Sequence, residues 1–155
     1  MDFQISALDR AQFAHLFELS DEELMARGAM RVVADKQPGF PCRLSLADAE
    51  PGENVLLVHY EHLSVNTPYR ASHAVYVRST ATQARPEVNE IPEMLRSRVL
   101  SLRGFDGHGM LKQADLAEGE ILRSRIKEML GNADVEYVHL HFAKAGCYAA
   151  RVDRV

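Results

Sequence analysis

The chain has 155 residues, of which 46% are hydrophobic and 26% charged, and its formal net charge is −4 at pH 7. This composition predicts a single globular domain over residues 1–155 with one core. The acidic balance argues against a nucleic-acid-binding module, which must neutralise phosphates. The first residues, MDFQISALDR, lack the pattern of a signal peptide, and no apolar run approaches the ~20 residues of a membrane span. We therefore expect a cytoplasmic protein with no membrane partner.

The first half of the chain alternates strand and helix signals. Side-chain alternation predicts a strand over Asp2–Ala7, with Phe3 and Ile5 on one side. The capping box Ser20-Asp21-Glu22-Glu23 predicts a helix that begins after Ser20 and ends near Gly28. The sequence AMRVVAD, which follows directly, predicts the next strand.

A hairpin is predicted in the middle of the chain. Val55–Tyr60 is a β-rich apolar run, and His73–Arg78 is a second one. The connection through Asn66-Thr67-Pro68 is too short for a parallel crossover, so the two strands are expected to pair antiparallel. The polar segment Ser79–Pro92 is then expected to be irregular.

The second half predicts a strand, a helix and a final hairpin. Val99–Leu102 is strand-like, and the glycines of RGFDGHGML are expected to end it in a turn. Asp115 with Glu118 suggests a helix N-terminus, and Gly131 suggests a left-handed residue at its end. Alternation in Tyr137–Phe142, followed by a turn and Cys147–Val152, predicts a hairpin. The fold class is therefore α+β: a mostly antiparallel sheet, one or two packed helices and a C-terminal β-hairpin.

His139 and His141 share one face of the predicted tail strand and could chelate a metal. A zinc site needs three or four ligands, and no third ligand stands at a diagnostic spacing. The best candidate partner is His59, with Glu61 on the same strand face. We therefore predict no metal site and no cofactor, and expect these histidines to be structural.

The loop before the second middle strand concentrates hydrogen-bond donors at Tyr69, Arg70, Ser72 and His73. An arginine fork suits a carboxylate or a phosphate, so this loop could bind a small anion. Alternatively, Arg70 pins the loop through backbone carbonyls. The two cysteines, Cys42 and Cys147, are expected to be reduced and to pack as small hydrophobic side chains.

Three segments together resemble a known family: FPCRLSLADAEPGENVLLVHYEH, TPYRASHAVYV and GCYAARVDR. They are similar to the uncharacterised bacterial family catalogued as domain of unknown function 1203, from Phe40 to the C-terminus. The resemblance implies a small cytoplasmic protein but carries over no catalytic or ligand-binding residue. It also implies that arginine is allowed at the position of His141, which leaves His139 as the better ligand candidate of the two.

Two hypotheses of function remain open. The first is a domain that binds a small anionic ligand, with or without enzymatic activity, whose pocket is formed by loop and tail residues. Its candidate residues are Tyr69, Arg70, His73, His139, Cys147 and Arg151. The second is a protein-interaction module, such as a homodimer, in which these polar groups are structural. A concave pocket would favour the first hypothesis and a flat apolar patch the second.

Overall fold

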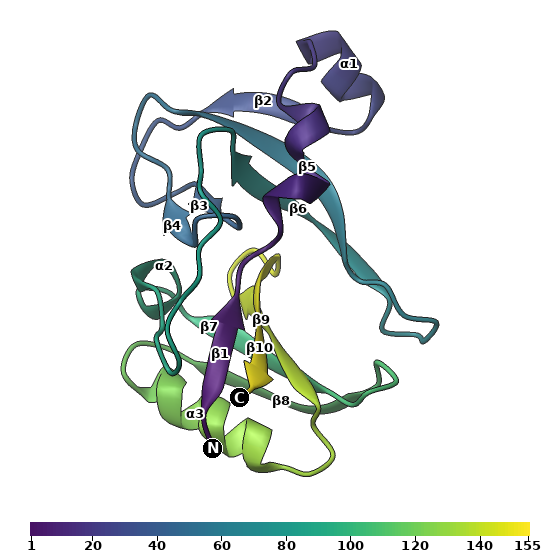
Figure 1. Ribbon diagram of the computed structural model, residues 1–155, viewed down its shortest axis with the longest axis vertical. Helices are drawn as coiled ribbons and strands as arrows, with labels where there is room; N and C mark the ends of the chain where they lie inside the picture. The colour runs from purple at the N-terminus through teal and green to yellow at the C-terminus, as the bar shows by residue number, and fades with distance from the viewer. The chain divides into compact units, whose positions relative to one another are not determined.

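The computed structural model describes residues 1–155, which divide into two compact units. Unit 1 comprises Met1–Ser6, Glu61–His73 and Arg85–Val155, and unit 2 comprises Ala7–Tyr60 and Ala74–Ala84. Each unit contains one five-stranded sheet, and most of the strand pairs are antiparallel. The predicted α+β class is therefore confirmed, with the strands distributed over two sheets (Figure 1).

The strand order of the unit 1 sheet is β1-β10-β9-β7-β8, and two helices accompany it. Their bounds are β1 Phe3–Ser6, α2 Glu93–Arg96, β7 Leu100–Phe105, β8 Leu111–Ala117, α3 Ile121–Gly131, β9 Tyr137–Phe142 and β10 Tyr148–Arg154. The predicted C-terminal hairpin is confirmed as β9 and β10, which pair antiparallel. The first predicted strand is confirmed as β1, whose Phe3 and Ile5 are buried.

The strand order of the unit 2 sheet is β2-β5-β6-β3-β4, with one short α-helix. Its elements are the 3-10 turns η1 Arg10–Gln12 and η2 Ala14–Leu16, then α1 Asp21–Ala26, β2 Met30–Val33, β3 Pro41–Cys42, β4 Ala47–Asp48, β5 Asn54–Leu63 and β6 Ala71–Arg78. The capping box predicted for α1 is present, with both the Ser20 and the Glu23 side chains bonded to backbone amides. β5 and β6 are neighbours in the sheet, and their linked ends, residues 61–73, belong to unit 1.

The structure corrects the sequence-based boundaries between residues 100 and 131. β7 continues through Gly104 to Phe105, and the residues around Asp115 form β8 instead of the start of a helix. β8 pairs with β7 along its whole length, so tertiary pairing outweighs the local capping signal of Asp115 and Glu118. The helix begins at Ile121, and Gly131 is its last residue without the left-handed conformation expected of it.

The two faces of the unit 1 sheet differ in what covers them. α3 buries Leu122, Ile126, Met129 and Leu130 and packs on β7, β8 and β9. A Cβ at Gly104 would lie 3.0 Å from the Met129 sulfur, so the face that carries Gly104 is the one under α3. Because side chains alternate along a strand, the neighbouring residues of β7 face the other way.

The face of the unit 1 sheet opposite α3 is rich in polar and aromatic side chains, and we call it the polar face. Strand register places its residues in three rows across β7, β9 and β10. The rows are Ser101, His141 and Tyr148; Arg103, His139 and Arg151; and Phe105, Tyr137 and Asp153.

Residues 61–73, which we call the arm, are fastened to the rest of unit 1 by apolar packing and a hydrogen bond. Leu63 forms a buried cluster with Phe105 and Tyr137 of the polar face, and Val65 packs against this cluster. The Thr67 hydroxyl donates a hydrogen bond of 3.0 Å to the Gly109 carbonyl. The arm is therefore held against one end of the polar face and the β7–β8 turn.

Gly109 lies at the contact between the turn and the arm, where no side chain fits. Its φ is +84°, and an added Cβ would lie 2.7 Å from a Val65 methyl carbon. We predict that Gly109→Ala lowers the free energy of unfolding by roughly 1–3 kcal/mol, because it combines left-handed strain with overpacking. Urea titration measures the change.

Gly107 in the same turn provides the matched control, because a Cβ there meets nothing within 4 Å. Gly107→Ala should leave the urea midpoint nearly unchanged. Equal effects of the two substitutions would show that the arm contact does not limit stability.

Candidate functional site: a three-histidine cluster

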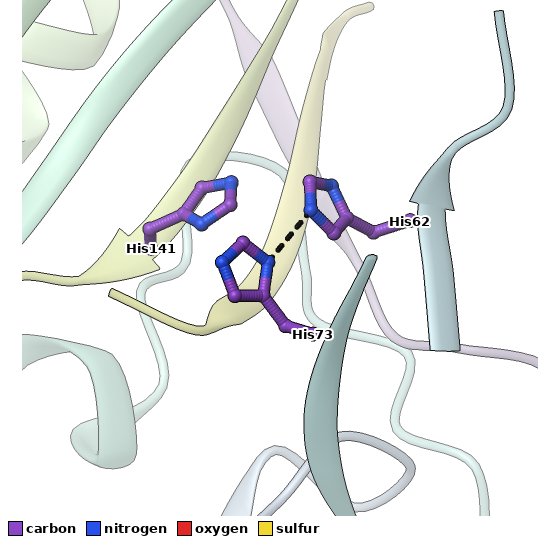
Figure 2. Close-up of side chains that lie close together, drawn as sticks. All are labelled: His62, His73 and His141. Atoms are coloured by element: carbon purple, nitrogen blue, oxygen red, sulfur yellow. Dashed lines mark hydrogen bonds between the residues drawn. The ribbon is translucent and has the colours of Figure 1, made fainter. Parts of the chain in front are cut away.

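Three histidines meet in unit 1: His62 and His73 of the arm and His141 of β9 (Figure 2). Each can offer one ring nitrogen such that the three nitrogens lie within 4.8 Å of one another. His62 Nε2 and His73 Nδ1 are 2.8 Å apart, and their rings are stacked with centroids 4.8 Å apart. The His141 ring lies edge-on to both. The cluster is therefore tight enough for all three rings to face a single small ion.

Local structure explains how each histidine reaches the cluster. His62 precedes Leu63, the residue that buries the arm against Phe105 and Tyr137. His73 lies near the start of β6, the neighbour of β5 in its sheet. His141 projects from the polar face because it pairs with Ser101 and Tyr148 on the adjacent strands.

Hydrogen bonding fixes the proton on one of the three rings. His141 Nδ1 lies 2.9 Å from the Gly146 carbonyl oxygen, which can only accept a hydrogen bond, so Nδ1 carries the proton. In the neutral ring Nε2 then holds a lone pair, and this atom is buried with no hydrogen-bond partner. A metal-binding histidine commonly donates its other ring N–H to a carboxylate, a backbone carbonyl or water, and the Gly146 carbonyl is a partner of this kind.

Two further rings surround the cluster. Tyr148 stacks on His62 with centroids 5.1 Å apart, and it lies edge-on to both His139 and His141. His139 is buried, and its ring centroid is 5.7 Å from that of His62. Like His62 Nδ1, His139 Nδ1 is a buried nitrogen without a hydrogen-bond partner. Such nitrogens cost free energy unless something satisfies them.

Burial keeps these histidines neutral. It lowers the pKa of His62 to about 4, with the charges of His73 and Arg103 acting in the same direction. It also lowers the pKa of His139 and of His141 to about 3 in each case. Neutral imidazole is the form that binds metals, so His62 and His141 need not lose a proton near pH 7.

The residues proposed from sequence for a ligand pocket all lie in unit 1 but are only partly brought together. His73 belongs to the cluster, and His139 lies beside it. Arg70 is largely exposed and bonds Glu61 at 2.8 Å, while Tyr69 lies edge-on to Phe105. Cys147 is half-buried, forms no disulfide and directly precedes β10.

Arg151, the last of these residues, has a structural setting. Its guanidinium lies 4.0 Å from the centroid of the Tyr137 ring and binds Asp153 at 2.6 Å. These contacts place it on the polar face with both its charge and its stacking surface occupied.

His62, Tyr148 and Arg103 were not predicted from the sequence. The third metal ligand was expected at His59, which is exposed and lies in unit 2, whereas the cluster uses the arm histidine His62. A signal was available in the hairpin. His62 and His73 stand at equal distances from the Thr67-Pro68 turn, the spacing of cross-strand neighbours in a symmetrical hairpin.

The comparison with known protein families decides the family. The family described as "Protein of unknown function (DUF1203)" matches residues 39–154. The chain belongs to the DUF1203 family. The DUF1203 match includes all three histidines of the cluster, and the family description gives them no role. No curated protein and no solved structure matches the chain. None of its helices is long and apolar enough to cross a membrane.

Histidine burial predicts a specific pH dependence for the metal-free protein. An unfolded histidine titrates near pH 6.5, whereas folded His139 and His141 titrate at about 3. Between these values the unfolded state binds more protons, so the free energy of unfolding falls as the pH falls below about 6.5. Each of the two should contribute a loss of about 1.4 kcal/mol between about pH 7.5 and about pH 5.5.

Urea unfolding at several pH values, in the presence of a chelator, measures this slope. His139→Phe should flatten it, whereas His59→Ala, which removes an exposed histidine, should not. A slope that His139→Phe leaves unchanged would show that His139 is not held neutral by burial.

Proposed function

We propose that the cluster of His62, His73 and His141 binds a divalent transition metal, with Zn²⁺ as the first candidate. The observation that carries the proposal is the convergence of one nitrogen from each of three imidazole rings within 4.8 Å. The buried, unpartnered Nε2 of His141 supports it. Imidazole ligands suit zinc, copper, iron and nickel, and burial keeps His62 and His141 neutral near pH 7.

The spacing of the nitrogens requires only small movements to hold a metal. Tetrahedral zinc with Zn–N bonds of ~2.0–2.1 Å places its ligand nitrogens about 3.3 Å apart. The His62–His73 pair, at 2.8 Å, would open slightly, and His141 would move in. The hydrogen bond between His62 and His73 would be replaced by two metal–nitrogen bonds.

Three protein ligands leave the fourth tetrahedral position to water or to an added ligand. Structural zinc sites are usually closed by four protein ligands, whereas three-ligand sites are typical of metals that bind and activate a small molecule. The expectation of a small-ligand domain therefore moves from Arg70 to the histidine cluster. The side chains next to the metal would determine which ligand takes the fourth position.

The first test is metal binding by untagged, chelator-treated protein. We predict about one Zn²⁺ or Co²⁺ per chain by calorimetry or equilibrium dialysis, and a higher thermal midpoint at saturating metal, because the metal binds the folded state. His62→Phe keeps a ring for stacking on Tyr148 but removes the ligand atoms, and it should weaken binding by about 100-fold or more.

His59→Ala serves as the matched control, since His59 is an exposed histidine on the same strand. It should retain wild-type metal affinity. Wild-type protein that binds no metal, or His62→Phe protein that binds as tightly as wild type, would refute the proposed site and leave the cluster a hydrogen-bonded part of the core.

A further inference from the structure

The polar face carries an arginine with an unusual lack of partners. Arg103 of β7 is half-buried, and its only hydrogen bond is from Nε to the Ser101 hydroxyl at 3.3 Å. No carboxylate lies within 4.0 Å of it. Arg151, in the same row of the sheet, has Asp153, and Arg154 donates to backbone carbonyls. Arg103 is therefore a half-buried cation whose terminal nitrogens make no hydrogen bond to the protein.

Strand register places Arg103 beside the histidine cluster. Arg103 lies directly across from His139, and Ser101 lies directly across from His141. The bond from Arg103 Nε to Ser101 directs the guanidinium along β7 toward the row of the sheet that contains His141.

Three carboxylates of the arm, β10 and the β7–β8 turn already bind other cations. Glu61 of the arm binds Arg70, Asp153 binds Arg151, and Asp106 of the β7–β8 turn binds Lys112. A divalent metal on three neutral histidines, next to Arg103, would give a local charge of about +3 with no protein anion to balance it. Partly buried positive charge of this size requires an anion.

We propose that Arg103 and the metal at His62, His73 and His141 together bind a small oxyanion, a carboxylate or a phosphate group. One oxygen occupies the fourth position on the metal, and another accepts hydrogen bonds from the terminal nitrogens of Arg103. The planar fork of arginine matches two oxygens of such a group. This inference rests on the proposed metal site and adds the chemical class of its ligand.

The experiment uses the full chain loaded with Co²⁺, whose visible absorption reports changes in metal ligation. Acetate and phosphate are titrated separately into wild type, Arg103→Gln, Arg103→Lys and Arg70→Ala. In wild type we expect saturable spectral shifts, and the anion with the lower half-saturating concentration identifies the carboxylate or phosphate class. Arg103→Gln should raise that concentration by about tenfold or more.

The other variants separate the guanidinium fork from charge alone and from other arginines. Arg103→Lys should give an intermediate value, because lysine keeps the charge but loses the fork. Arg70→Ala should behave as wild type, because Arg70 is exposed and paired with Glu61. Co²⁺ affinity of Arg103→Gln should equal or exceed that of wild type, since a neighbouring positive charge has been removed.

Failure of this inference differs from failure of the metal site. If the wild-type protein binds no Co²⁺, the metal site and the oxyanion site are both refuted. If Co²⁺ binds but neither anion changes its spectrum, or Arg103→Gln responds like wild type, the metal site stands and the role of Arg103 is refuted. A loss of anion binding in Arg70→Ala alone would assign the anion to the arm arginine and also refute it.

Discussion

The candidate site depends on the packing of Leu63 and Val65 against Phe105 and Tyr137. Two of the three clustered histidines, His62 and His73, belong to the arm, while the third belongs to the sheet. Without this apolar contact the arm would be a free hairpin end, and its histidines would be solvated like ordinary surface side chains. Burial of apolar surface next to the histidines is therefore what brings them together. Burial also keeps His62 and His141 neutral.

The polar face shows how one sheet serves two purposes. Below it, Leu102, Val138 and Leu140 belong to the buried core on the side of α3. On the polar face, the charge of Arg151 is balanced by protein groups alone. Its guanidinium binds the Asp153 carboxylate and lies over the Tyr137 ring. Arg103, on the same row, lacks both. The two arginines of this row therefore differ in their partners.

Much of the fold could be predicted from local sequence, and the failures share one cause. The capping box of α1 and the alternation in β9 are signals within a few residues, and both are confirmed. β8 was missed because its identity comes from pairing with β7, which outweighs the helix signal at Asp115. The site was missed for a similar reason. His62 and His141 are far apart in sequence, and only the tertiary packing of the arm makes them neighbours.

The order of strands in unit 1 has a consequence for how the protein is made. β1 pairs only with β10, and β10 lies between β1 and β9. β1 therefore cannot join the sheet until β10 has been synthesised. During translation the sheet cannot close until residue 154 has left the ribosome, whereas most of unit 2 precedes residue 61. Such distant pairings are slow to form. Until then, the unpaired strand edges of the incomplete sheet are exposed, and such edges make partly folded chains prone to aggregation.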